Sequence, residues 1–175
     1  VRRLVSNMSF DLPVTAFDAQ AIETEPNMES KVSRRLKEPL AQEICDHIYG
    51  PRLSRDFARQ FEYLSDINQA HLLMLSHCKL VSPAVARQLA AGLLQMEAEG
   101  PAAVDLDPAK EDPYFNYEAK LMSITGRDTG GRLHMARSRN DIVATIDRLR
   151  GRMAVLDVID ALGRLRAVAL ERAGT

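Results

Sequence analysis

The chain has 175 residues, enough for one domain with a substantial core, and its 46% hydrophobic and 27% charged residues are typical of a soluble globular protein. Its 23 basic and 24 acidic side chains nearly balance, which argues against a dedicated nucleic-acid binder. No run approaches the ~18 consecutive apolar residues of a membrane span, and residues 1–10 lack the apolar run of a signal peptide. We therefore expect a cytoplasmic protein that binds neither nucleic acid nor membrane.

The first part of the chain predicts an irregular arm followed by a helix. Residues 1–30 contain Pro13 and Pro26 and show no steady period. From residue 31 to residue 48, apolar side chains recur every four residues, which predicts an amphipathic helix with a kink or break at Pro39. The run Tyr49-Gly50-Pro51 is expected to end this helix.

Three further helices are expected before residue 130. Ser54 can cap the first of them, and Ser82 followed by Pro83 is a strong start for the second. Gly100 and Gly126 are expected to end the second and the third. The predicted helices cover about residues 54–78, 82–100 and 111–124, with loops at 101–108 and 127–137.

The two cysteines, Cys45 and Cys78, are too few for a disulfide framework. Both fall within helical patterns, so we expect buried free thiols rather than redox or metal groups. His47 and His77 have no ligand-like partners at metal spacing, and no metal site is predicted.

The last segment, from about Arg139 to Ala173, carries the clearest helical pattern. Its apolar side chains alternate in steps of four and three, which is typical of a helix packed in a bundle. A helix of this length is rarely stable alone, so the pattern predicts partner helices. Because every strong apolar pattern in the chain has a period near 3.6, we expect an all-α fold. The apolar positions of the last segment are Ile142, Ile146, Leu149, Met153, Leu156, Ile159, Leu162 and Leu165.

Residues 130–141, at the start of this long helix, are the candidate site. Ser138 and Asp141 have the spacing of a capping box, so one interpretation is a well-capped helix with solvated charges. The other interpretation is an anion site. A helix N-terminus presents free N–H groups, Arg137 and Arg139 could bind a carboxylate or phosphate, and Asn140 adds an amide.

The order of residues in this stretch carries a family resemblance. Gly-Gly-Arg-Leu-His-Met-Ala-Arg-Ser-Arg-Asn-Asp, over residues 130–141, resembles the loop of argininosuccinate lyase that leads into its central helix. Residues 111–126, 70–75 and 143–149 also resemble stretches of that family. The resemblance covers roughly residues 30–173.

The resemblance implies the mainly helical fold of the fumarase/aspartase type, in which long helices from four subunits form a central bundle. After the irregular arm of residues 1–30, residues 31–137 would be the N-terminal helical domain and residues 138–175 the start of a truncated bundle domain. The family removes a proton next to a carboxylate and expels a nitrogen or oxygen leaving group. Its members release fumarate and need no cofactor. The resemblance therefore implies a homotetrameric carbon–nitrogen lyase that cleaves the small molecule argininosuccinate into arginine and fumarate.

The resemblance also assigns residues to the substrate site. Ser138, Arg139 and Asn140 would hold a carboxylate of the succinyl part, and Arg137, Ser54 and His134 are further candidate contacts. The catalytic His and the flexible serine loop of the family are expected beyond Thr175. We therefore expect no catalytic residue in this chain and no activity from the chain alone.

Three positions depart from the family pattern. The family usually has His at the position of Tyr114, and Thr and Gly at the positions of Met135 and Ala136. These departures leave open a lyase that acts on another N-substituted aspartate. A non-catalytic structural protein on the same scaffold is a further alternative.

Overall fold

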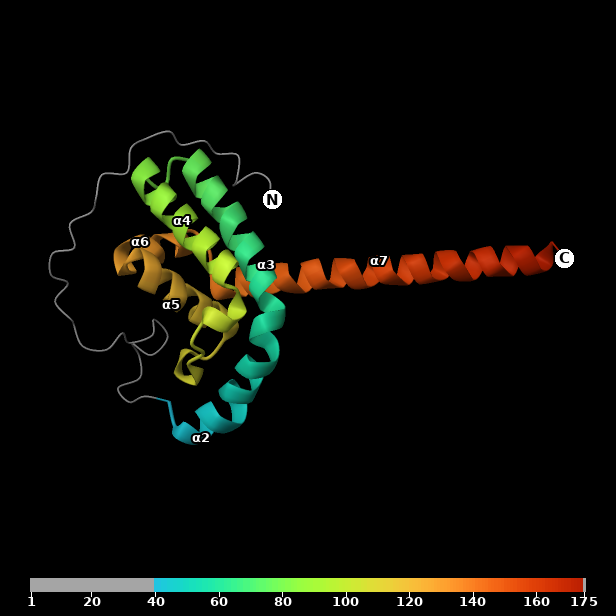
Figure 1. The fold of residues 1–175 in the computed structure, drawn as a ribbon, viewed down its shortest axis with the longest axis horizontal. Helices are drawn as coiled ribbons and strands as arrows, with labels where there is room; N and C mark the ends of the chain where they lie inside the picture. Colours follow the sequence, from blue (N-terminus) through green and yellow to red (C-terminus); the bar gives the residue numbers. More distant parts are fainter. Residues whose placement is uncertain (1–39, 175) are drawn as a thin grey trace.

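The computed structural model describes residues 40–174, and every regular element in that range is a helix (Figure 1). This confirms the all-α class. The arm expected over residues 1–30 and the first half of the helix expected over residues 31–48, with the kink or break expected at Pro39, lie outside the described residues. In chain order the elements are α2 (Gln42–Ile44), the π-helical turn η2 (Cys45–Tyr49), α3 (Gly50–His77), α4 (Pro83–Glu99), the 3₁₀ turns η3 (Pro101–Ala103) and η4 (Pro108–Lys110), α5 (Pro113–Thr125), α6 (Arg127–Gly131), the 3₁₀ turn η5 (Arg132–His134) and α7 (Arg139–Ala173).

The predicted break at Gly50 and Pro51 is wrong, because the chain stays helical from α2 through η2 into α3. The turn before α3 widens, and the Gly50 N–H donates to the carbonyl of Cys45, five residues back. A Cβ atom on Gly50 would lie 2.9 Å from that carbonyl oxygen, so the wide turn requires glycine. Pro51 then occupies the first turn of α3, directly after the widened turn.

The predicted start and end of α4 are confirmed. The Ser82 hydroxyl accepts a hydrogen bond from the Val85 N–H at 3.3 Å, and Pro83 is the first helical residue. Gly100 follows α4 and Gly126 follows α5, with φ of 76° and 83°. Both helices therefore end where the chain needs a left-handed conformation that glycine adopts without strain.

The loop expected over residues 127–137 is largely wrong, because the chain forms α6 and then η5 there. Gly130 is needed for close packing and not for a turn. A Cβ atom on it would lie 2.7 Å from Cγ and 2.8 Å from Cα of Met122 on α5. Only the short stretch between His134 and Arg139 is non-helical, and Ala136 adopts φ of 62° there.

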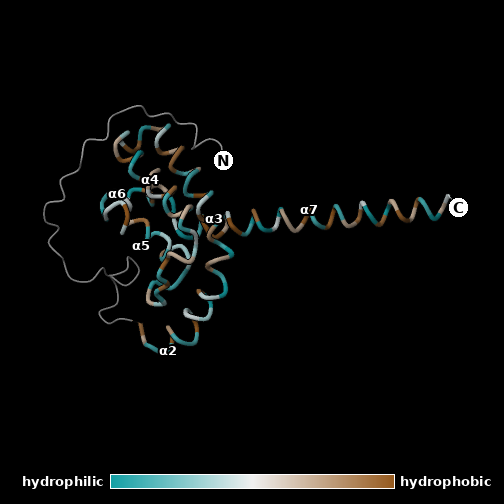
Figure 2. The backbone as a smooth tube through the Cα atoms, viewed as in Figure 1, coloured by the Kyte–Doolittle hydropathy of each residue, from teal (hydrophilic) through white to brown (hydrophobic). Residues whose placement is uncertain are grey.

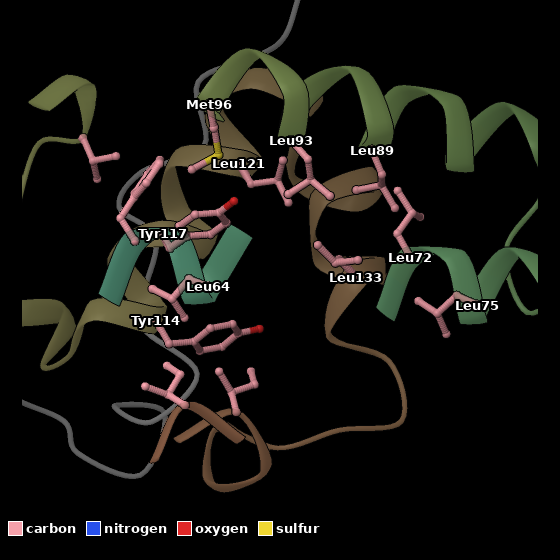
Figure 3. Packing of buried hydrophobic residues seen from close by; sticks show 14 of the residues in the cluster. Leu64, Leu72, Leu75, Leu89, Leu93, Met96, Tyr114, Tyr117, Leu121 and Leu133 are labelled. Carbon is pink, nitrogen blue, oxygen red and sulfur yellow. The ribbon is translucent and has the colours of Figure 1, made fainter. Parts of the chain in front are cut away.

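The core lies between α3, α4 and α5 (Figure 3). Tyr117 of α5 is fully buried, its ring centroid lies 5.5 Å from that of Phe61, and its hydroxyl lies 3.1 Å from the Ser65 hydroxyl. Cys45 is buried as predicted, whereas Cys78 is exposed just beyond the end of α3, so that part of the expectation is wrong. The cluster comprises Phe57, Phe61, Leu64, Leu72, Leu75, Val81, Ala86, Leu89, Leu93, Met96, Val104, Tyr114, Tyr117, Leu121, Leu133, Ile142 and Ile146.

Helix α7 begins and ends at the predicted residues and extends away from the other helices (Figure 1). Only Ile142 and Ile146, in its first two turns, are buried against the core. Beyond them, apolar residues alternate with polar ones along a helix with no partner in the described structure (Figure 2). No described helix, α7 included, combines the length and apolar character needed to cross a membrane. The exposed apolar residues, which we call the α7 stripe, are Met153, Val155, Leu156, Val158, Ile159, Leu162, Leu165, Val168 and Leu170.

Replacing Gly130 by Ala should destabilise the chain by about 1–2 kcal/mol, because the new methyl group would overlap the Met122 backbone. The matched control is Gly131→Ala, since a Cβ atom on Gly131 has no neighbour within 4 Å. That control should be neutral or stabilising by up to about 1 kcal/mol, from helix propensity. Urea unfolding followed by circular dichroism measures both, and equal effects would contradict this packing.

Replacing Ala136 by Gly should stabilise the chain. An L-residue in the left-handed region costs roughly 1–2 kcal/mol, and the greater freedom of glycine in the unfolded chain offsets about half of that. We expect a net gain of about 0.5–1 kcal/mol in the free energy of unfolding. The control is Ala144→Gly, an exposed site inside α7 where the same change should lose about 1 kcal/mol. A loss of stability in both variants would show that the backbone at residue 136 is not in the left-handed region.

Candidate functional site

The candidate site is the short non-helical stretch before α7 and the first turn of that helix. Ser138 and Asp141 form the predicted capping box, and the Ser138 N–H donates to Asp141 Oδ2 at 2.7 Å. These hydrogen bonds hold the pKa of Asp141 below its ordinary value. The cap thus fixes where α7 begins and leaves the remaining free N–H groups of its first turn pointing towards solvent.

Arg137, the first candidate arginine, is packed inwards. Its guanidinium lies 5.7 Å from the centroid of the Tyr114 ring and donates to Oδ1 of Asn68 on α3. Burial lowers the pKa of Arg137, because desolvation penalises the charged form. Among the described residues, Nε and Nη1 of Arg137 and Nδ2 of the buried Asn68 have no hydrogen-bond partner.

Arg139, the second candidate arginine, is tied to two carboxylates. Its Nη1 lies 3.0 Å from Asp112 Oδ2 and 3.5 Å from Glu111 Oε2. Its guanidinium carbon lies 5.5 Å from the centroid of the Phe115 ring. The Arg139 side chain therefore reaches back towards the start of α5, and its charge is largely balanced within the chain.

Ser138, between these two anchored arginines, and Asn140, directly after Arg139, are both exposed. The Ser138 side chain takes part in the helix cap. The Asn140 side chain makes no hydrogen bond to another described residue, so both its donor and its acceptor face solvent. Of the candidate residues on this turn, Asn140 is the one whose side chain is available to a ligand.

His134 belongs to a polar cluster that the sequence did not reveal. Its Nδ1 lies 3.0 Å from Glu118 Oε1 and 2.8 Å from the Tyr114 hydroxyl, which in turn donates to Glu118 Oε1 at 3.2 Å. Burial and the neighbouring Glu118 charge raise the pKa of Tyr114, so its hydroxyl stays protonated. His134 also lines an open pocket of about 670 Å³ together with Arg127, Arg132 and Met135.

His71 of α3 fastens the same stretch from the other side, with Nε2 2.9 Å from the Met135 carbonyl oxygen. Burial, followed by the nearby charge of Arg137, lowers the pKa of His71 and favours the neutral ring. A neutral ring with hydrogen on Nε2 donates to that carbonyl. The stretch is thus held by α3 and α5 together.

Ser54 is the candidate residue that the structure does not bring to this turn. It is exposed in the first turns of α3, fourteen residues before Asn68, which corresponds to roughly 21 Å along a helix. Two partners of the site that sequence patterns missed, Asn68 and Glu118, are buried, and so is Tyr114, which the sequence marked only as a departure from the family pattern. Buried polar residues on otherwise apolar helix faces are the signal that could have pointed to them.

Comparisons with known proteins were made with the whole chain. No model of a known protein family matches it. The chain is 37% identical over 139 residues to argininosuccinate lyase 1 of Shouchella clausii, an alignment that covers 79% of this chain and 28% of that protein. It is 45% identical over 104 residues to argininosuccinate lyase of Methanospirillum hungatei, and that alignment covers 59% of this chain and 21% of that protein. It is 36% identical over 142 residues to argininosuccinate lyase of Nitrosomonas europaea, and that alignment covers 81% of this chain and 30% of that protein.

The chain thus spans less than a third of the length of these relatives. The similarity extends over much of the chain and corresponds to the N-terminal region of each relative. In its sequence and in its all-helical structure, the chain therefore belongs with the N-terminal part of the argininosuccinate lyase family.

Proposed function

We propose that this chain forms part of the active site of a lyase that cleaves argininosuccinate into arginine and fumarate by β-elimination. The names of its relatives support the reaction class. The observation that carries the proposal is the exposed, unoccupied amide of Asn140 in the first turn of a capped helix. Under this proposal the residues around Ser138 and Asn140 bind a carboxylate of the succinyl group.

The physical argument rests on charge. Loss of the proton next to a carboxylate moves negative charge onto that carboxylate, so donors placed there stabilise the transition state more than the ground state. The N-terminus of α7 supplies free N–H groups and a partial positive charge, and Asn140 supplies a side-chain donor. Arg137, half-buried behind the turn, adds a positive charge that solvent screens only weakly.

The other two candidate residues have indirect roles in the proposal. His134 shapes the wall beside the turn, since its Nδ1 is held by Glu118 and Tyr114. Ser54 lies far along α3 from Asn140. In the proposal it therefore contacts substrate bound at the Asn140 turn of another copy of the chain.

The proposal assigns the proton-transferring groups to parts of the lyase outside this segment. The relatives are more than three times as long as the aligned segment, and Asp141, the exposed carboxylate next to Asn140, is engaged in the helix cap. Residues 31–137 would form the N-terminal helical domain and residues 138–175 the start of a bundle domain. The chain by itself is therefore proposed to be inactive.

The second part of the proposal concerns assembly. The α7 stripe leaves nine large apolar side chains exposed on one protruding helix, which is far more than an isolated helix would keep in water. We propose that equivalent helices cover it in a homotetramer with a central bundle. Such an assembly would also bring groups from other copies to the base of α7.

A lyase acting on another N-substituted aspartate is the second candidate. The observation that favours it is the position of Tyr114, which is buried and bonded to both Glu118 and His134 beside the candidate turn. The larger side chain that stands where the family usually has His lies against His134, which lines the pocket. Assays with argininosuccinate and with other N-substituted aspartates distinguish the two candidates by the substrate that releases fumarate.

In the active lyase that contains this segment, Asn140→Ala should lower fumarate release at least about tenfold. Losing one hydrogen bond to a charged group costs about 1.5–3 kcal/mol, and about 1.4 kcal/mol corresponds to a factor of ten. Steady-state kinetics with thermal melts measure the effect. Asp147→Ala, an exposed change farther along α7, is the control and should leave the rate unaltered. A folded Asn140→Ala variant with the wild-type rate would mean that the turn is only a helix cap.

The 175-residue chain should self-associate through the α7 stripe. Leu156→Asp should shift the weight-average mass towards the monomer, because a carboxylate cannot be buried in an apolar seam without a large desolvation cost. Asp157→Asn, at an exposed position of α7 that is already polar, is the control and should leave the mass close to that of the wild type. Sedimentation equilibrium gives these masses, and a wild-type chain that stays monomeric at high concentration would rule out the interface.

A further inference from the structure

The turn before α5 has a strained backbone. Glu111 adopts φ of 69° and ψ of −49°, and the Asp112 N–H donates to the Lys110 carbonyl oxygen at 2.8 Å. This is the classic γ-turn, which is rare for any residue with a Cβ atom. Such strain persists only where the surrounding structure holds it, and it clusters at functional sites.

The strained turn places two neighbouring carboxylates on one guanidinium. Glu111 and Asp112 follow one another in the chain; Asp112 Oδ2 accepts a hydrogen bond from Nη1 of Arg139, and Glu111 Oε2 forms an ion pair with the same atom at 3.5 Å. Their side chains are only 15% and 9% exposed, against 40% for Arg139. The γ-turn therefore brings two largely buried negative charges to the first residue of α7.

The two oxygens of Asp112 have different tasks. Oδ1 accepts the Phe115 N–H at 3.0 Å and caps α5, while Oδ2 accepts Arg139 Nη1 at 3.0 Å. The ring of Phe115, in the first turn of α5, lies under the same guanidinium. One carboxylate thus joins the N-terminus of α5 to the N-terminus of α7.

We infer that Arg139 is a positioning residue and that Asp112, Glu111 and Arg139 form a clamp that orients the first turn of α7. The clamp sets the direction in which Ser138 and Asn140, on either side of Arg139, face the ligand. This inference rests on the proposed function, and it differs from the role that the family resemblance implied for the Arg139 side chain. If that side chain left the clamp to bind a substrate carboxylate, Asp112 Oδ2 would remain buried without a counter-charge, which is costly.

A double-mutant cycle with exchange measurements tests the clamp in the 175-residue chain. Asp112→Asn removes the charge but keeps a residue that caps helices well, and Arg139→Gln removes the partner charge. Each variant should speed amide hydrogen exchange at Asp141, whose N–H is held by the Ser138 side chain, and at Ile142, the next amide of the helix, about three- to tenfold, and the double variant no further. Arg139→Lys should restore part of the protection. Arg132→Gln, which breaks the exposed pair with Asp128, is the control and should leave these amides unchanged. Unchanged exchange in both single variants would overturn the clamp.

Kinetics of the active lyase separate positioning from direct binding. If the clamp positions Asn140, Asp112→Asn and Arg139→Gln should lower kcat/KM by similar factors that do not multiply, with partial rescue by Arg139→Lys. A large loss in Arg139→Gln with a wild-type rate in Asp112→Asn would show that Arg139 binds the substrate and would overturn the inference. A wild-type protein without lyase activity would refute the proposed function alone, because the exchange experiment still decides whether the clamp orders the turn.

Discussion

The segment that leads into α7 is held by buried polar side chains of α5, and the remaining features of the site depend on that attachment. One side of α5 contributes Tyr117 and Leu121 to the core, while Tyr114 and Glu118 bond to His134 at the end of η5 and Asp112, the cap of α5, bonds to Arg139 at the start of α7. Buried polar groups are costly unless they are paired, and these pairs flank the short segment that leads into α7. The same helix thereby stabilises the fold and determines where α7 begins.

The two arginines that flank Ser138 illustrate how similar charges acquire different roles. Arg137 is placed against an aromatic ring and an amide, and the charge of Glu118 in the neighbouring polar cluster also acts on it. Arg139 meets two carboxylates and a ring, so its field is largely cancelled locally. An anion approaching this turn therefore meets the partial positive charge of the helix terminus and the half-buried Arg137, while the charge of Arg139 is already paired.

Features that depend on neighbours in sequence were predictable, and features that depend on distant contacts were not. The bounds of α7, the Ser82 cap and the glycines that end α4 and α5 follow from local spacing, and the structure confirms them. The helix through Gly50 and Pro51 required a widened turn, and Gly130 required the proximity of Met122, neither of which spacing reveals. For the same reason the residue types around α7 indicated a site, but the direction of the Arg139 side chain could only come from the fold.

Helix α7 spans about 52 Å, of which only the first two turns rest on the core. A ligand at its base and a partner along its exposed length would therefore act on one rigid body. If a bound anion orders the first turn, association has less conformational entropy left to remove from the helix. Association would likewise strengthen anion binding, and the coupling free energy is the same in both directions. Occupancy of the site and association of the chains would then be thermodynamically coupled. The association constant would depend on the ligand concentration, and the apparent ligand affinity would depend on the chain concentration.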